Sequence, residues 1–190
     1  MTSRKTSQTV LVAVITLVFA LFNAQLFAQK LEIGKVPAVV GLSGDEGGRV
    51  DGTAWSSSEI KSKVFVMFYV DPDVKDLNEH VGDALKAENF PEEKFQSIAM
   101  INMAATWLPN FAIASSLKSK QEKFPRTIYV KDTNKTMVKQ WGFTDDEYNI
   151  ALFDHNGKLI MRKDGKFSPE DTSKLISDIK AAIKNIDSNS

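Results

Sequence analysis

The sequence predicts an α/β domain in which a central mixed β-sheet carries helices on both faces. A continuous apolar run at residues 63–70, KVFVMFYV, is typical of a strand that is buried on both sides. Strand-like and helix-like segments then alternate along the chain. The last segment, residues 168–186, places its apolar side chains on one helical face and begins with a Ser168 cap and Pro169 in the first turn.

A glycine-rich segment, GDEGG at residues 44–48, precedes the central strand. Glycine supplies the positive φ that a tight turn needs, and residues 38–42 and 49–53 flank this turn. We therefore expect an N-terminal β-hairpin. A phosphate-binding loop is the alternative, but no Lys-Ser/Thr pair closes the segment and no helix pattern follows it.

Two helices and a second strand follow the central strand. Residues 71–86 have apolar side chains at helical spacing, and residues 95–103 form another buried strand. Residues 111–124 form the second helix, which Pro125 ends. The order to this point is therefore βαβα.

Two further turns indicate antiparallel pairs of strands. Residues 127–131 and 136–141 flank the turn DTNK, and residues 149–154 and 158–162 flank the turn DHNG. Asp, Asn and Gly favour such turns through side-chain hydrogen bonds and positive φ. We expect a hairpin at each turn.

The first residues have the layout of a secretory signal peptide. Arg4 and Lys5 precede an uncharged apolar run of 13 residues, 10–22, which is shorter than the roughly 20 residues of a membrane-spanning helix. We expect cleavage after Ala28 and a domain at residues 29–190. An uncleaved anchor is the alternative, because Leu26 is large for its place before the cleavage site. Both alternatives place the domain outside the cytoplasm.

The composition excludes several classes of function. The chain has no cysteine, so it has no disulfide, no thiolate metal ligand and no thiol redox couple. Removal of residues 1–28 leaves 162 of the 190 residues, with 22 basic and 24 acidic side chains and a net charge of −2. This charge attracts neither nucleic acid nor anionic lipid. We expect no cofactor.

The order of elements resembles that of thioredoxin-like proteins of the peroxiredoxin and periplasmic reductase type. The segment at residues 124–143, FPRTIYVKDTNKTMVKQWGF, resembles a strand and turn of that family, and residues 151–160, ALFDHNGKLI, resemble the hairpin after its cis-proline. The resemblance implies a thioredoxin-like three-layer fold.

A narrower resemblance is to the YtfJ family of small periplasmic proteins, which implies a periplasmic location. The features that carry it are short and structural rather than catalytic. They are the N-terminal leader, Asn102, Pro109, Ser115-Ser116-Leu117, Phe124-Pro125, Trp141 and the segment KDGKFSPED at residues 163–171.

The redox positions depart from the thioredoxin-like pattern. Where Cys-x-x-Cys would open the helix after the central strand, residues 71–76 read DPDVKD, and Asp73 and Asp76 align nearest the missing cysteines. Tyr148 falls at the cis-proline position. Thiol exchange requires an attacking thiolate and a resolving thiol. We therefore expect no thiol–disulfide oxidoreductase or peroxidase activity.

Carboxylates near the start of this helix allow two interpretations. Asp71, Asp73 and Asp76 could hold a cation, because Asp-x-Asp with a third acid resembles part of a calcium loop. They lack the glycine at the bend, and acids also cap helix N-termini, which is the interpretation that we favour. His80 and His155 have no metal-ligand neighbour at useful spacing and are expected at the surface, so no metal site is predicted.

The loop at residues 102–111 is the most site-like segment. It leaves the second strand at the carboxyl end, where α/β sheets usually bind ligands. Trp107 is either an exposed contact for a partner or a lid over the sheet. The acids at residues 145–147 form a solvated loop next to Tyr148.

These features predict a binding or scaffolding module for an unknown protein or peptide partner. The face expected to bind comprises Asp73, Asp76, Trp107 and Tyr148. The alternatives are a non-thiol enzyme or cation-binding protein that uses Asp71, Asp73 and Asp76, and a structural protein of the cell envelope. Contact with a membrane is expected only through a retained leader, and contact with nucleic acid is not expected.

Overall fold

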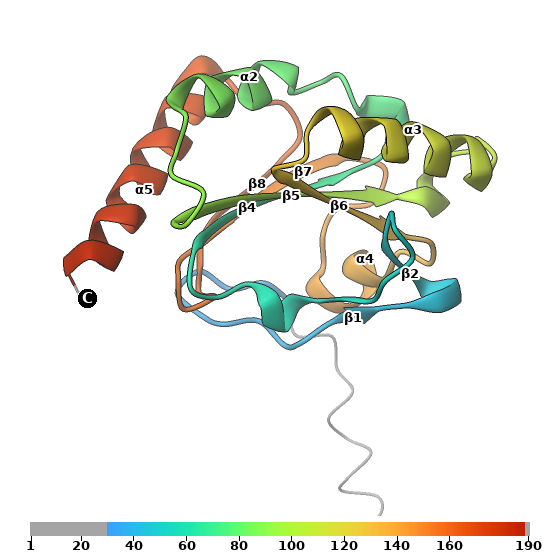
Figure 1. The fold of residues 1–190 in the computed structure, drawn as a ribbon, viewed down its shortest axis with the longest axis horizontal. Helices are drawn as coiled ribbons and strands as arrows, with labels where there is room; N and C mark the ends of the chain where they lie inside the picture. The colour runs from blue at the N-terminus through green and yellow to red at the C-terminus, as the bar shows by residue number, and fades with distance from the viewer. Residues whose placement is uncertain (1–29, 189–190) are drawn as a thin grey trace, which may run out of the picture.

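The computed structural model describes residues 30–188, at whose centre lies a six-stranded mixed sheet (Figure 1). β4 (Val64–Val70) lies in the middle and pairs in parallel with β5 (Phe95–Asn102) and antiparallel with β7 (Tyr148–Phe153). The full order is β2 (Gly47–Arg49), β6 (Thr127–Asp132), β5, β4, β7 and β8 (Leu159–Asp164). The predicted central strand and its neighbours are confirmed. The predicted leader, residues 1–28, lies outside the described residues.

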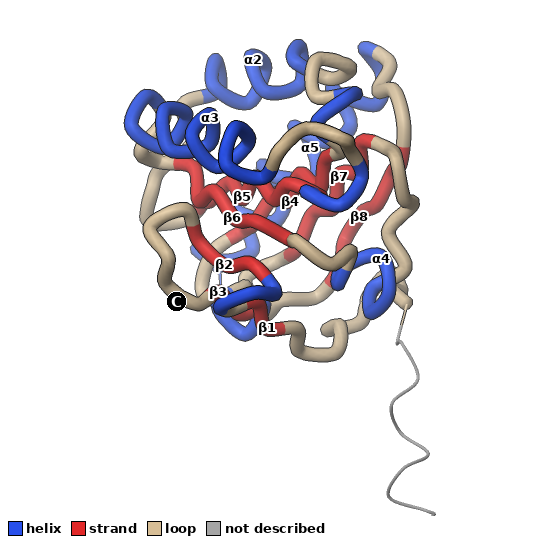
Figure 2. Tube along the Cα trace, turned by 90° about the vertical axis from the view of Figure 1, so that its right-hand side faces the viewer, coloured by secondary structure: helices blue, strands red, loops and turns tan. Residues whose placement is uncertain are grey.

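Helices cover both faces of the sheet. α2 (Glu79–Glu88), α3 (Asn110–Lys123) and α5 (Pro169–Ser188) lie on one face. The short α4 (Thr136–Trp141) and a small sheet of β1 (Gly41–Leu42) and β3 (Trp55–Ser56) cover the other face (Figures 1 and 2). This arrangement confirms the predicted α/β class and its three layers. Within residues 30–188, no helix combines the length and apolar character needed to cross a bilayer.

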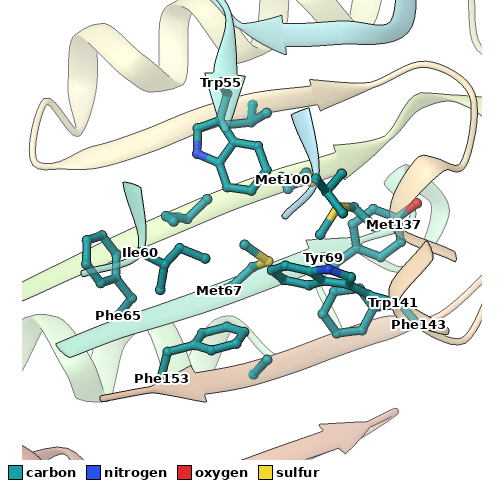
Figure 3. Packing of buried hydrophobic residues seen from close by; sticks show 14 of the residues in the cluster. Trp55, Ile60, Phe65, Met67, Tyr69, Met100, Met137, Trp141, Phe143 and Phe153 are labelled. Carbon is teal, nitrogen blue, oxygen red and sulfur yellow. The ribbon is translucent and has the colours of Figure 1, made fainter. Parts of the chain in front are cut away.

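The central strand explains the continuous apolar run, because all seven of its residues are buried. Successive side chains of a strand point to opposite faces. Val64, Val66 and Phe68 pack in the layer of α2 and α5. Met67 and Tyr69 pack in the opposite layer, where Figure 3 shows them beside aromatic rings that come from other elements.

The N-terminal strands pair differently from the predicted hairpin. β1 pairs with β3 rather than with residues 49–53, and β2 leaves the turn to pair antiparallel with β6 at the edge of the central sheet. Gly47 makes this possible, because a Cβ at Gly47 would lie 1.9 Å from the carbonyl oxygen of Lys131. The glycine-rich segment thus serves a close backbone approach as well as a turn.

The prediction of a strand at residues 136–141 is wrong, because this segment forms α4. Oδ1 of Asp132 accepts the amide of Thr136 at 2.8 Å, and Oδ2 accepts the amide of Met137 at 2.9 Å, so one buried carboxylate caps the first turn. Gly142, with φ of 68°, ends the helix. The buried indole of Trp141 donates to the carbonyl of Ala38 at 2.9 Å and fixes α4 to the N-terminal layer.

Candidate functional site

The chain turns sharply where the central strand ends. Oδ1 of Asp71 accepts the amide of Asp73 at 2.8 Å, and Pro72 opens the 3-10 turn η4 (Pro72–Val74). The helix predicted from residue 71 begins only at Glu79 as α2. Asn78 explains this later start. Its buried side chain binds the carbonyl of Gly165 and the amide of Phe167, each at 2.9 Å. The backbone of Asn78, with φ of −125°, is not helical, so the helix begins after it.

The two acids aligned with the missing cysteines lie in different surroundings. Oδ1 of Asp73 accepts the hydroxyl of Thr106 at 3.0 Å, which ties η4 to the loop before α3. Asp76 is exposed and pairs with Lys75 at 3.0 Å. Of the three acids expected to cap this helix, Asp71 accepts a backbone amide, but it caps a 3-10 turn rather than α2, which has no side-chain cap.

Asp71 is a carboxylate that folding removes from water, with 4% of its surface exposed. Burial raises its pKa above 3.8, and the negative charges of Asp73, Asp146 and Asp145 act in the same direction. The amide of Asp73 opposes this shift without cancelling it. An ionised Asp71 is therefore costly to the folded state.

Asp145 reaches the same region from the loop before β7. Its Oδ1 accepts Nδ2 of Asn102 at 2.9 Å, and its Oδ2 accepts the ammonium of Lys135 at 2.6 Å. Burial alone would raise the pKa of Asp145, but these two donors outweigh it and hold the pKa below 3.8. Asp145 thus joins the carboxyl end of β5 to the start of α4.

A calcium-like group does not form from Asp71, Asp73 and Asp76. Asp71 is turned into the fold and bound to a backbone amide, whereas Asp76 lies at the surface beside Lys75. Among residues 30–188, no three side chains of the Asp, Glu, His or Cys type gather as a metal site requires.

Three apolar side chains stand exposed where β5 leads into α3. Trp107 is 85% exposed, Phe111 is 78% exposed, and Leu108 between them is 36% exposed. We call Trp107, Leu108 and Phe111 the aromatic surface. Its base is fixed, because Met103 in the 3-10 turn η5 (Met103–Ala105) and Ile113 of α3 are buried in one cluster. The exposed indole cannot be a lid over the sheet.

Tyr148 is buried rather than exposed, with 8% of its surface accessible. The residue pairs with Val70 across β7 and β4, and its ring packs edge-on against Phe68 at 6.2 Å between centroids. Burial raises the pKa of its hydroxyl well above the ordinary value. Its side chain supports the sheet and is not available to a partner in this conformation.

The structure brings together some predicted residues and adds others. Asp73 and the loop of Trp107 meet through Thr106, whereas Asp76 and the side chain of Tyr148 lie apart from that contact. Phe111 and Asn102 belonged to the site-like loop but were not singled out as contacts. Their signal was their place at the two ends of a segment that follows a buried strand.

Comparison with known proteins gives the family. Residues 42–182 match the family model described as "Bacterial protein of unknown function (YtfJ_HI0045)". The chain belongs to this family. The protein YtfJ of Escherichia coli K12 is 22% identical over 134 residues, which cover 68% of this chain and 72% of that protein. A Haemophilus influenzae protein is 29% identical over 134 residues, with the same coverage.

Solved structures with this fold include redox proteins. The exposed lipoprotein thioredoxin Etrx1 of Streptococcus pneumoniae has a TM-score of 0.57 and 14% identity, over 76% of this chain and 99% of Etrx1. BsSco, of the Sco family of cytochrome c oxidase assembly proteins, has a TM-score of 0.53 and 16% identity, over 82% of this chain and 98% of BsSco. These likenesses show a thioredoxin-like fold, which here contains no cysteine.

Proposed function

We propose that this YtfJ-family chain is exported to the periplasm and acts there as a non-redox binding module, which docks a protein partner on the aromatic surface. The exposure of Trp107 and Phe111 carries the proposal. Aromatic side chains are enriched in interface cores, and each removes a large apolar area from water when it is covered.

The rigid base of the surface supports a role in docking. The hydrogen bond from Thr106 to Asp73 joins η5 to η4, and Thr106 also accepts the amide of Leu108 at 3.3 Å. Met103 and Ile113 are buried on either side of the exposed residues. A partner therefore meets side chains whose backbone is already ordered, which lowers the entropic cost of binding.

Site-specific crosslinking tests the docking. A photoreactive phenylalanine analogue is placed at Trp107 or Phe111, and at the exposed control positions Lys139 and Lys184. We expect one adduct from the first two positions only. With the analogue at Phe111, Trp107→Ala should abolish this adduct, whereas Ile33→Ala, at another exposed apolar residue, should leave it. Equal adducts from all four positions, or none, would refute docking at this surface.

Export is tested by the N-terminus of the protein purified from cells. The predicted leader gives a chain that begins at Gln29 and is released with the periplasmic fraction. Met1 retained on membrane-bound protein would establish an uncleaved anchor instead. Recovery from the cytoplasm would contradict export.

The absence of thiol chemistry is tested separately. The purified protein should reduce insulin and consume peroxide no faster than a boiled control, because the chain has neither a nucleophilic nor a resolving thiol. Activity above the control would require chemistry that the carboxylates of residues 71–76 do not offer, and it would overturn the non-redox part of the proposal.

A further inference from the structure

A group of carboxylates borders the aromatic surface. Asp73 binds Thr106, the residue before Trp107, and Asp145 binds Asn102, the last residue of β5. The negative charges of Asp73, Asp145 and Asp146 all act on the carboxyl of Asp71, so the four belong to one electrostatic neighbourhood. We call Asp71, Asp73, Asp145 and Asp146 the acidic border.

Cations within the fold balance only part of this charge. Lys135 lies 2.6 Å from Asp145 and 3.6 Å from Asp146. Asp71 and Asp73 have no ion pair among residues 30–188. Among residues 30–188, Lys135 is thus the one cation that forms an ion pair with any of these four carboxylates, so the group carries more negative than paired positive charge.

The side chain of Asn102, next to the acidic border, has a hydrogen-bond acceptor that is unpaired among the described residues. Only 1% of its surface is exposed, and its Oδ1 has no hydrogen-bond partner within the described part of the chain, although its Nδ2 binds Asp145. A buried acceptor without a donor is unfavourable. Carboxylates and amide oxygens accept hydrogen bonds, so this part of the fold favours N–H donors over anions.

The aromatic rings also favour cations. The face of an indole or phenyl ring attracts an ammonium or guanidinium group, and long basic side chains place their methylenes on apolar surface. An apolar segment that carries lysine or arginine would therefore gain from both features. An anionic bilayer would be repelled by the acidic border.

On the basis of the proposed function, we infer that the partner docks a basic, apolar peptide segment, whose apolar side chains cover Trp107 and Phe111 while its Lys or Arg side chains meet Asp73 and Asp146, the exposed members of the acidic border. The acidic border then steers association and selects against anionic segments. Binding should weaken as salt screens these charges.

Fluorine NMR of the full chain labelled with fluorotryptophan can test this inference. Trp107 is highly exposed, whereas Trp55 and Trp141 are buried, so Trp107→Phe assigns the reporting resonance. The probes are three pools of degenerate octapeptides made from leucine and phenylalanine, with lysine and arginine in the first, aspartate and glutamate in the second, and serine and glutamine in the third.

We expect the cationic pool to shift the Trp107 resonance at concentrations at least about tenfold lower than the other two pools. Raising NaCl from about 50 to about 300 mM should weaken this binding at least about fivefold. The variant D73N/D145N should weaken it similarly, because it removes charge and keeps the acceptors for Thr106 and Asn102. The matched variant E93Q/E122Q, at exposed acids elsewhere, should not.

Other outcomes would overturn the inference. Equal shifts by the neutral or anionic pool, or no shift by any pool, would exclude a basic segment. A shift with phosphatidylcholine vesicles would identify lipid as the occupant, and a shift with protein concentration alone would identify a second copy. Position-specific adducts at Trp107 and Phe111 would still stand in the first two cases, so failure of the inference is distinguishable from failure of the proposed function.

Discussion

Asp132 and Asp71 are both buried carboxylates at strand ends, but they differ in how many hydrogen bonds they accept. Asp132, the last residue of β6, accepts the amides of Asn134 and Thr136 on Oδ1, and the amide of Met137 and the hydroxyl of Tyr69 on Oδ2. Asp71, directly after β4, receives the amide of Asp73 and lies among other acids. Within the described part of the chain, the carboxylate of Asp132 has four hydrogen-bond donors, whereas that of Asp71 has one.

The apolar side chains repeat this contrast. Near Asp132, Tyr69 stacks on Phe143 with ring centroids 5.2 Å apart, and Trp141 lies against Phe153 at 5.7 Å (Figure 3). Near Asp71, the rings of Trp107 and Phe111 face solvent. Conflicts with the rules of a stable core are expected at functional positions. We therefore propose that the α4 region contributes stability and that the face formed by η4 and η5 provides the binding surface.

The largest expected effect compares two tryptophans. Trp141→Ala removes a buried ring, with 0% of its surface exposed, and leaves a cavity, so we expect a loss of about 3–5 kcal/mol in the free energy of unfolding. Trp107→Ala should change it by less than about 0.5 kcal/mol. Urea denaturation of both variants measures this. Equal losses would mean that Trp107 is a core residue in solution.

Removal of the Asp132 carboxylate should have the next largest effect. Asp132→Ala withdraws the cap of α4 and leaves the buried hydroxyl of Tyr69 without its acceptor, at a combined cost of about 3 kcal/mol. Asp132→Asn keeps one acceptor oxygen and should cost less. If both variants unfold like the wild type in urea, the four bonds to Asp132 do not stabilise α4.

Much of the fold could be predicted because its signals are local. Residues 64–70, VFVMFYV, are apolar on both faces of the strand, which is typical of a central strand covered on both sides. The predicted start of α5 is also confirmed, because Ser168 and Asp171 cap each other through backbone amides at 3.1 and 2.8 Å.

The errors in the fold arise where distant contacts decide local structure. The turn-like residues 132–135 predict a strand at residues 136–141, but Asp132 and the packing of Trp141 make this segment helical. The site was predictable only as a location. The exposure of Trp107 depends on which neighbours bury Met103 and Ile113, and the burial of Tyr148 depends on its register with Val70.

A smaller effect on the free energy of unfolding is expected at Asp71, where removal of the charge should stabilise the protein rather than destabilise it as at Asp132. Burial raises the folded pKa of this carboxyl above 3.8, so its contribution to stability is full below the unfolded pKa and is lost as pH rises through the folded pKa. Asp71→Asn keeps an acceptor for the Asp73 amide without the charge. The variant should therefore be more stable than the wild type at pH 7.

This gain should disappear as the pH falls below the ordinary aspartate value, because the wild-type carboxyl is then protonated in both states. Denaturation midpoints measured from pH 3 to pH 8 would show the two curves converging at the acidic end. A variant that is less stable at every pH would show that the charge of Asp71 is favourable, and it would remove the contrast with Asp132.

The smallest effect on stability is expected at the link between η4 and η5. Thr106→Val preserves shape but removes the hydroxyl that binds Asp73 at 3.0 Å and accepts the Leu108 amide at 3.3 Å. These bonds are exposed, so their loss should cost less than about 1 kcal/mol.

The aromatic surface should nevertheless lose order, because its buried anchors lie on either side of this link. Hydrogen exchange at the Leu108 amide should therefore accelerate, and the adduct at Phe111 should weaken. Ser119→Ala, which removes an exposed hydroxyl bond to Ser115 within α3, should change neither. Unchanged exchange in Thr106→Val would show that the packing of Met103 and Ile113 orders the surface without this link.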